Sequence, residues 1–169
     1  NLFFMKYYVF RNSTLELFFN ELDCKFSGYG DSLSFDGSFD RYVFFYNLLN
    51  KTDNDLIAKE IEFYKHNIDF ILSKLSKSKT FIIFTIERTL KLNFDSSENL
   101  IDKFVYDFNS YLYELEKKVP NIKIISINNF YEKYALKDRI DWKYYFLSKM
   151  ELNPSYLNSF SEWFKNQIK

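Results

Sequence analysis

The chain has 169 residues, of which 23 are basic, 23 are acidic and 22% are aromatic. This length suits one domain with a sizeable core, and the balanced charge excludes a basic field that would recruit nucleic acid or an anionic membrane. The single cysteine, Cys24, excludes an intramolecular disulfide and favours a reducing, cytoplasmic location, and no apolar run reaches membrane-spanning length.

The chain begins at Asn1 rather than Met and shows no signal peptide. We therefore interpret residues 1–169 as a single domain that belongs to the N-terminal part of a longer protein.

The first predicted elements are a strand, a tight turn and a helix. Residues 2–10 form a short, aromatic and β-prone run, as in a buried strand. The apolar positions from Leu15 to Leu22 then have helical spacing, and Asn12, Ser13 or Thr14 is the expected helix cap.

Two further short strands are predicted at residues 24–29 and 41–48. All three glycines fall between Gly28 and Gly37. In a chain so poor in glycine, this concentration predicts one irregular, exposed and flexible loop.

The rest of the chain alternates helices and strands. An amphipathic helix is predicted over 53–76, a strand over 80–86, a second long helix over 97–119 and a fifth strand over 122–127. Short helices are expected at 130–134 and 142–150, and a last helix opens at Pro154.

Apolar strands that alternate with long helices predict an α/β fold. We expect a three-layer, doubly wound parallel sheet of about five strands, as in flavodoxin-like and SGNH-hydrolase-like domains. In such a fold the functional site lies at the carboxyl ends of the strands.

The letters Gly30-Asp31-Ser32-Leu33 spell the GDSL motif of a hydrolase superfamily. In those enzymes the motif directly follows the first strand and opens the first helix, whose free amides stabilise an oxyanion. Ser32 follows a second strand and precedes no helical stripe. We therefore interpret Ser32 as a loop residue that has no nucleophilic role and is not paired with a base.

The position expected for a nucleophile is instead held by Arg11-Asn12-Ser13-Thr14, after the first strand. This turn, the "GYG" at 28–30, the third strand and the C-terminal "DWKYYFLSKMELNPSYLNSF" follow one another as in a known family. In this order the chain resembles the N-terminal, SGNH-hydrolase-like domain of FkbH-like proteins. The resemblance covers nearly the whole chain, and its best local segment runs from Asp141 to Pro154.

The resemblance implies a set of candidate catalytic residues. Ser13 stands where the nucleophile is expected, and the oxyanion-hole asparagine after the third strand is Asn47 or Asn50, although either serves equally well as a helix cap. Where a base histidine is expected, the chain has Glu151, a carboxylate of ordinary acidity and hence a poor base. Asp138 and Asp141 are the other carboxylates available to replace the missing partners.

His66 is the only histidine, and it lies midway along the predicted helix 53–76. We expect it on the helix surface or at the edge of the core, away from the strand ends.

Candidate ligand-binding residues are Asn12, Asn50, Arg88 and Lys149. Arg88 follows the clearest strand, and it either closes the loop through a salt bridge with Glu87 or holds a carboxylate or phosphate group of a ligand. Asp141 is expected to cap the helix 142–150, and Lys149 either faces the site or lies at a solvent-exposed helix end.

No metal site and no cofactor are expected. One cysteine and one histidine cannot supply a zinc site, the aspartates at 31, 36 and 40 lack the spacing of a calcium loop, and the glycine-rich segment lacks the lysine of a P-loop.

The resemblance also implies partners. FkbH-like proteins usually carry, after this domain, a HAD-type phosphatase-like domain that can load a glyceryl unit onto a carrier protein, so such a domain in the same protein and an acyl carrier protein are the expected partners. The leading hypothesis is a degenerate binding or docking module in polysaccharide or secondary-metabolite assembly. The alternative is an active serine esterase or acyltransferase that uses Ser13.

Overall fold

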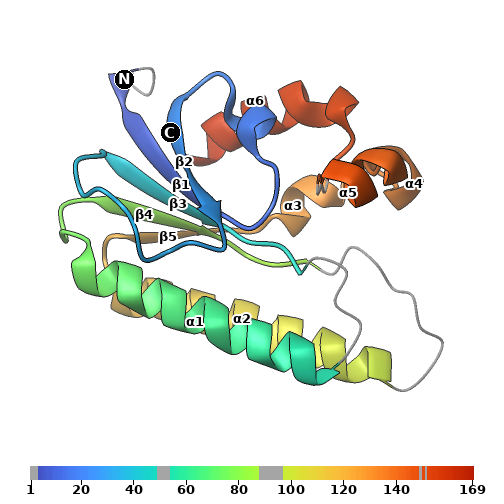
Figure 1. Ribbon diagram of the computed structural model, residues 1–169, viewed down its shortest axis with the longest axis horizontal. Coiled ribbons are helices and arrows are strands. Elements are labelled where there is room, and N and C mark those ends of the chain that lie inside the picture. Colours follow the sequence, from blue (N-terminus) through green and yellow to red (C-terminus); the bar gives the residue numbers. More distant parts are fainter. Residues whose placement is uncertain (1–3, 49–53, 88–96, 149, 151) are drawn as a thin grey trace.

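A five-stranded parallel sheet forms the centre of the molecule (Figure 1). The computed structural model describes residues 4–48, 54–87, 97–148, 150 and 152–169. The strands are β1 (Lys6–Arg11), β2 (Asp23–Tyr29), β3 (Arg41–Phe45), β4 (Thr80–Phe84) and β5 (Ile122–Ile125), in the spatial order β2-β1-β3-β4-β5. This order and the helices on both faces confirm the predicted doubly wound, flavodoxin-like α/β fold.

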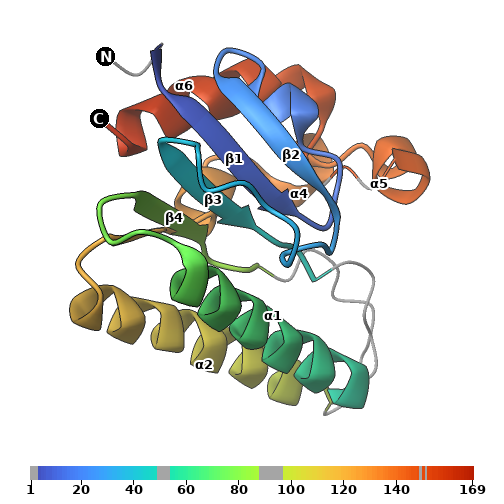
Figure 2. The same cartoon turned by 60° about the vertical axis from the view of Figure 1, so that its left-hand side comes forward.

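Helices cover the two faces of the sheet (Figure 2). The long helices α1 (Asn54–Lys74) and α2 (Ser97–Lys118) pack side by side on one face. The other face is covered by the 3₁₀ turn η2 (Glu16–Phe19), α3 (Asn128–Tyr131) and α6 (Leu157–Gln167). The short elements α4 (Leu136–Arg139), α5 (Trp142–Ser148) and η3 (Pro154–Tyr156) connect α3 to α6.

The aromatic strands are apolar throughout because both faces of the sheet are buried. Along β1, Tyr8 and Phe10 face the core under α1 and α2, whereas Tyr7 and Val9 face the core under α6. Within the described residues, no helix has both the length and the apolar character needed to cross a membrane.

The helix predicted from Leu15 is wrong in type and length. Only Glu16–Phe19 is helical, as a single 3₁₀ turn, and no side chain caps it. Phe18 and Phe19 are buried against the aromatic rings of α6, and β2 begins at Asp23, so the chain has no room for further turns. The expected cap residues Asn12, Ser13 and Thr14 bond to other segments.

The segment 28–37 differs from the exposed loop predicted for it. Gly28 belongs to β2, and Gly30 has a φ of 73°, a left-handed conformation that glycine adopts without strain. Ser32 is buried, with 1% of its surface exposed, although Leu33 and Gly37 are exposed.

Three predicted strands and two short helices end earlier than expected. β3, β4 and β5 end at Phe45, Phe84 and Ile125. Beyond them the backbone amides of Asn47, Ile86 and Ile127 bond to the side chains of Asn12, Asn109 and Thr85 instead of to a neighbouring strand. The short helices occupy 128–131 and 142–148 rather than 130–134 and 142–150.

Candidate functional site

The candidate site lies where the chain changes faces of the sheet. After β1 the chain crosses through η2 to the edge strand β2, whereas after the neighbouring β3 it crosses through α1 on the opposite face. The loops that follow β1 and β3 therefore diverge at the carboxyl edge, the point at which open α/β sheets bind ligands.

Asn12 joins these two loops through its side chain. Its Oδ1 accepts a hydrogen bond from the backbone N–H of Asn47 at 2.8 Å, and its Nδ2 donates to the backbone carbonyl of Asn47 at 2.7 Å. An amide side chain has one donor group and one acceptor, so it pairs with a main chain as a neighbouring strand would. The predicted ligand-binding residue Asn12 is thus occupied by the protein itself.

Tyr64 of α1 completes this junction. Its hydroxyl accepts from Asn12 Nδ2 at 3.0 Å and donates to the Asn47 carbonyl at 2.8 Å. Burial raises the pKa of Tyr64 far above its ordinary value, so the residue remains a neutral hydrogen-bonding group.

Ser13 and Asn47, two of the candidate catalytic residues, are brought together. Ser13 lies between β1 and η2, as predicted, and its Oγ accepts a hydrogen bond from Asn47 Nδ2 at 2.9 Å. Ser13 has 0% of its surface exposed and Asn47 has 7%. Among the described residues, no carboxylate or imidazole is hydrogen-bonded to Ser13, so no base is in place to activate its hydroxyl.

Ser32 has a different partner. Its hydroxyl lies 2.8 Å from the hydroxyl of Tyr46, and burial raises the pKa of Tyr46 to about 12. A phenol of that pKa is protonated at neutral pH and cannot act as a general base. Ser32 therefore supports the loop after β3 from inside the protein.

The candidate carboxylate Asp141 is engaged in capping. Its Oδ1 accepts from the backbone N–H of Lys143 at 3.0 Å and of Tyr144 at 3.5 Å, which confirms the predicted cap of the following helix. Asp138, the other carboxylate considered, is exposed on α4.

Four candidates, Asn50, Arg88, Lys149 and Glu151, lie outside the described residues. His66 is exposed on α1, as predicted for a helix-surface residue. Among the described residues, no three His, Cys, Asp or Glu side chains form a group that would hold a metal ion.

Beyond β4, two residues that were not predicted from the sequence bond to the main chain of other segments, and one of them, Asn109, repeats the paired bonds of Asn12. Asn109 of α2 accepts from the N–H of Ile86 and donates to its carbonyl, both at 3.0 Å. Thr85 Oγ1 accepts from the N–H of Ile127 at 3.0 Å. A polar residue on the inner stripe of a predicted helix, as at Asn109, is the signal that points to such a role.

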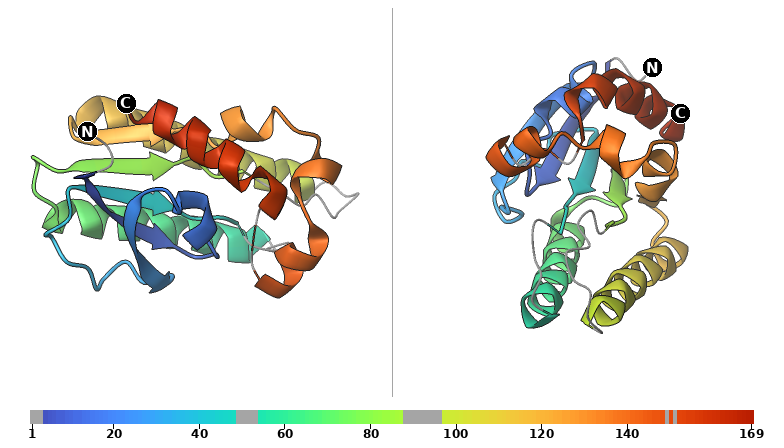
Figure 3. Two further views of the ribbon diagram at one scale, coloured as in Figure 1. Left: turned by 90° about the horizontal axis from the view of Figure 1, so that it is seen from above. Right: turned by 90° about the vertical axis from the view of Figure 1, so that its right-hand side faces the viewer.

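The end of α5 contacts the carboxyl edge of the sheet beside β1 and β2. The Thr14 hydroxyl donates to the Ser148 carbonyl at 2.5 Å and accepts from the Tyr29 hydroxyl at 2.8 Å. The guanidinium of Arg11 lies 4.7 Å from the ring centre of Tyr29 and forms an ion pair with Glu16. The bond from Thr14 to Ser148 holds the end of α5 beside the loop that follows β1 (Figure 3).

A pocket of about 350 Å³ lies at the opposite, amino-terminal edge of the sheet. It is lined mainly by Leu72, Leu75, Val119 and Pro120, with Lys77 and Lys118 at its rim. Lys118 is the last residue of α2, and Lys77 lies three residues beyond the end of α1. Cations are favourable near helix C-termini, so these two lysines need no ligand to explain them.

The chain was compared with known proteins. No protein-family model matches it, and no curated protein sequence matches it. A similar solved structure is the N-terminal part of the protein BF1531 from Bacteroides fragilis, which contains a phosphatase domain and is complexed with Mg. The two share 12% sequence identity with a TM-score of 0.71, over 95% of this chain and 50% of that chain. The chain thus matches the fold of about half of that solved chain, which is itself the N-terminal part of its protein.

Proposed function

We propose that this chain is an SGNH-hydrolase-like domain of the FkbH type that acts as a binding or docking module beside a HAD-type phosphatase domain in the same protein. Its role would lie in the assembly of a polysaccharide or secondary metabolite, with an acyl carrier protein as a further partner. The solved Bacteroides fragilis structure supports the phosphatase domain as a partner, because this fold and a phosphatase domain occur there in one chain.

The burial and hydrogen bonding of Ser13 are the main support for a non-catalytic role. Its side chain is fully buried, and its Oγ accepts a hydrogen bond from Asn47. A nucleophilic serine needs access to substrate and a base within hydrogen-bonding reach. Within the described residues, Ser13 has neither.

A second candidate function, a serine esterase or acyltransferase, is favoured by one observation. The Ser13 hydroxyl and the Asn47 amide are 2.9 Å apart at the carboxyl edge of the sheet. A nucleophile beside an amide donor is the start of an oxyanion site, and Glu151 or Asp138 would then have to supply the base.

Labelling with a fluorophosphonate probe, which reacts covalently with activated serines, separates the two functions. We expect no labelling of the native protein at neutral pH. Labelling that is lost in Ser13→Ala but kept in the control Ser32→Ala would establish the esterase or acyltransferase instead. Mass spectrometry of the labelled peptide identifies the serine.

A further inference from the structure

The two edge strands of the sheet, β5 and β2, differ in how their outward main-chain groups are satisfied. At β5 the protein closes the edge itself. Glu116 of α2 accepts a hydrogen bond from the N–H of Ile124 at 2.6 Å, and the carbonyl of Val119 accepts one from the N–H of Ile122 at 3.1 Å. Such closure protects an edge strand against pairing with another chain.

The bonding of β1 shows which main-chain groups of β2 point outward. The carbonyl of Arg11 accepts a hydrogen bond from the N–H of Gly30, which follows β2, whereas the carbonyl of Lys6 accepts one from Asp40, which precedes β3. Main-chain groups alternate in direction along a strand. The odd-numbered residues of β1 therefore bond to β2, and the even-numbered ones bond to β3.

The outer edge of β2 is open. Tyr7 is paired with Cys24 in the parallel register, so the main chain of Tyr7 bonds to the residues on either side, Asp23 and Lys25. The N–H and C=O groups of Cys24 and Phe26 consequently point away from β1. Among the described residues, nothing forms a hydrogen bond to these outward groups.

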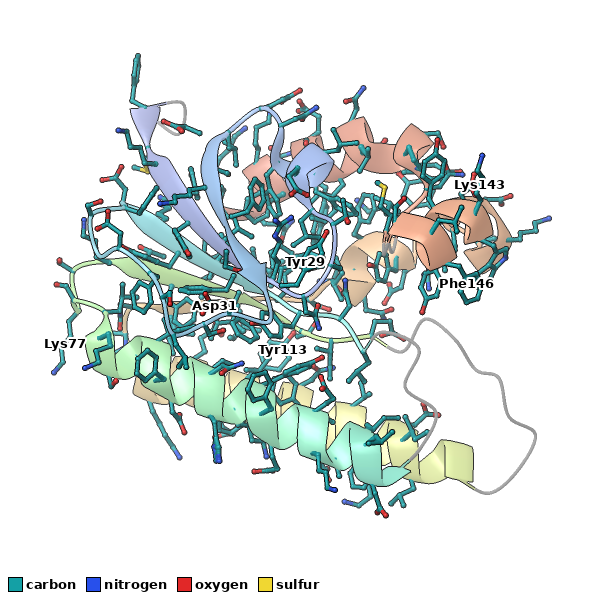
Figure 4. The ribbon with its side chains drawn as sticks, viewed as in Figure 1. Tyr29, Asp31, Lys77, Tyr113, Lys143 and Phe146 are labelled. Atoms are coloured by element: carbon teal, nitrogen blue, oxygen red, sulfur yellow. The ribbon has the colours of Figure 1, made fainter. Side chains whose placement is uncertain are left out.

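The open stretch is short and has defined ends. At its start the N–H of Leu22 donates to the carbonyl of Phe19 at 3.0 Å. At its end the carbonyl of Gly28 accepts from the N–H of Asp31, which lies beyond Tyr29, the last residue of β2 (Figure 4). A strand added here forms only a few hydrogen bonds, so its position along β2 depends on the side chains.

The exposed face of β2 carries one acidic and one basic side chain, Asp23 and Lys25. Lys6 of β1 is the sheet neighbour of Asp23, and Asp36 attracts Lys25 electrostatically. Within the described part of the chain, none of these four groups forms an ion pair. A lysine on an edge strand opposes pairing with a cationic partner but favours a partner that sets a carboxylate opposite it.

A second copy of the chain offers that carboxylate in a single register. Two copies related by a two-fold axis pair their β2 strands antiparallel. An axis at Asp23 or at Lys25 sets like charges opposite each other, and an axis at Phe26 sets both charges opposite uncharged residues. An axis at Cys24 sets Asp23 of each copy opposite Lys25 of the other. The charges thus favour a second copy centred on Cys24.

We propose that the β2 edge joins two copies of this chain, as antiparallel strands centred on Cys24, into one continuous sheet. The outward N–H and C=O groups of the two Cys24 residues bond to each other. Asp23 and Lys25 then occupy non-hydrogen-bonded positions, where facing side chains lie closest. Because the strands run antiparallel, the carboxyl edges of the two sheets point in opposite directions. The inference does not depend on the function proposed above.

The expected dimer is reversible. The open stretch of β2 is smaller than a standard interface, which buries about 800 Å² on each partner. We therefore expect a Kd of about 1–100 µM.

Sedimentation velocity of the full-length polypeptide over a concentration series measures this Kd. Asp23→Lys and Lys25→Asp should each raise it at least about tenfold, because each sets like charges opposite each other twice. A mixture of these two variants should associate about as tightly as the parent, since every facing pair is then of opposite charge. The mixture also shows that both variants are folded. As matched controls, Lys103→Asp and Asp107→Lys, at an exposed ion pair of α2, should leave the Kd within about twofold.

Two outcomes would overturn the inference. One is a parent protein that remains monomeric at about 1 mM. The other is a mixture of Asp23→Lys and Lys25→Asp that associates no more tightly than either variant alone, which would mean that the two charges do not face each other across the contact.

Discussion

Asparagine side chains replace strand pairing at the carboxyl edge of the sheet. Asn12 and Asn109 each give one acceptor and one donor to the main chain of a residue that follows another strand, Asn47 or Ile86. The loops are thus fixed without regular secondary structure, and the polar backbone groups near the core remain satisfied.

Asn12→Ala should lower the free energy of unfolding by about 1–3 kcal/mol, because it leaves the backbone N–H of Asn47 without its acceptor. Urea denaturation measures the change. Asn158→Ala, an exposed asparagine on α6, is the matched control and should change stability by less than about 0.5 kcal/mol. Equal effects of the two substitutions would mean that the Asn12 junction contributes no stability.

Among the elements, η2 differs most from the helix expected in its place. η2 and α5 are a single 3₁₀ turn and a seven-residue helix, and each depends on contacts outside itself. For η2 these are the rings of Phe160 and Phe164 in α6, and for α5 they are Asp141 and Thr14. Short helices are marginal alone, so their position is set by the surrounding structure.

Replacing the cap of α5 separates the contribution of the capping hydrogen bonds of Asp141 from that of its negative charge. Asp141→Ala should lower the free energy of unfolding by about 1 kcal/mol, whereas Asp141→Asn should be nearly neutral because asparagine caps helices equally well. Urea denaturation, combined with hydrogen exchange at the Lys143 amide, measures both effects. If the asparagine variant is as unstable as the alanine variant, the negative charge rather than the cap is what matters.

At the scale of the whole molecule, burial of ionisable groups makes stability depend on alkaline pH. Burial raises the pKa of the Cys24 thiol from 9.0 to about 12 and that of Tyr46 from 10.0 to about 12. The unfolded chain releases these protons near the ordinary values. Between about pH 9 and pH 12 it therefore binds fewer protons than the folded protein, and stability falls as pH rises.

We accordingly expect the urea midpoint to be nearly constant between about pH 6 and pH 8 and to fall from there towards pH 12. The midpoint of the variant Cys24→Ala should begin to fall about one pH unit later than that of the parent, because the contribution that starts lowest is removed. A midpoint that does not change up to about pH 11 in the parent protein would contradict the buried, protonated state of both groups.

Much of this architecture is predictable because apolar runs identify strands and long stripes identify helices. The five strands, the two long helices and the position of Ser13 follow from such patterns. The short length of η2 cannot be predicted from the sequence, because Leu15, Phe18 and Phe19 have the spacing of any amphipathic helix. The role of Tyr64 cannot be predicted either. Its ring belongs to an ordinary apolar stripe, but its hydroxyl bonds to the carbonyl of Asn47, which lies 17 residues earlier in the chain.

The contact between α6 and η2 has a consequence for the order of events during synthesis. The Ser161 hydroxyl donates to the carbonyl of Phe18, 143 residues earlier. At ribosomal speed, on the order of ten seconds separate the appearance of these two residues. During that time β3 and β4 are synthesised after β1 while α6 is still missing. The aromatic side chains that these strands place under α6 therefore remain without their cover until the last part of the chain is made.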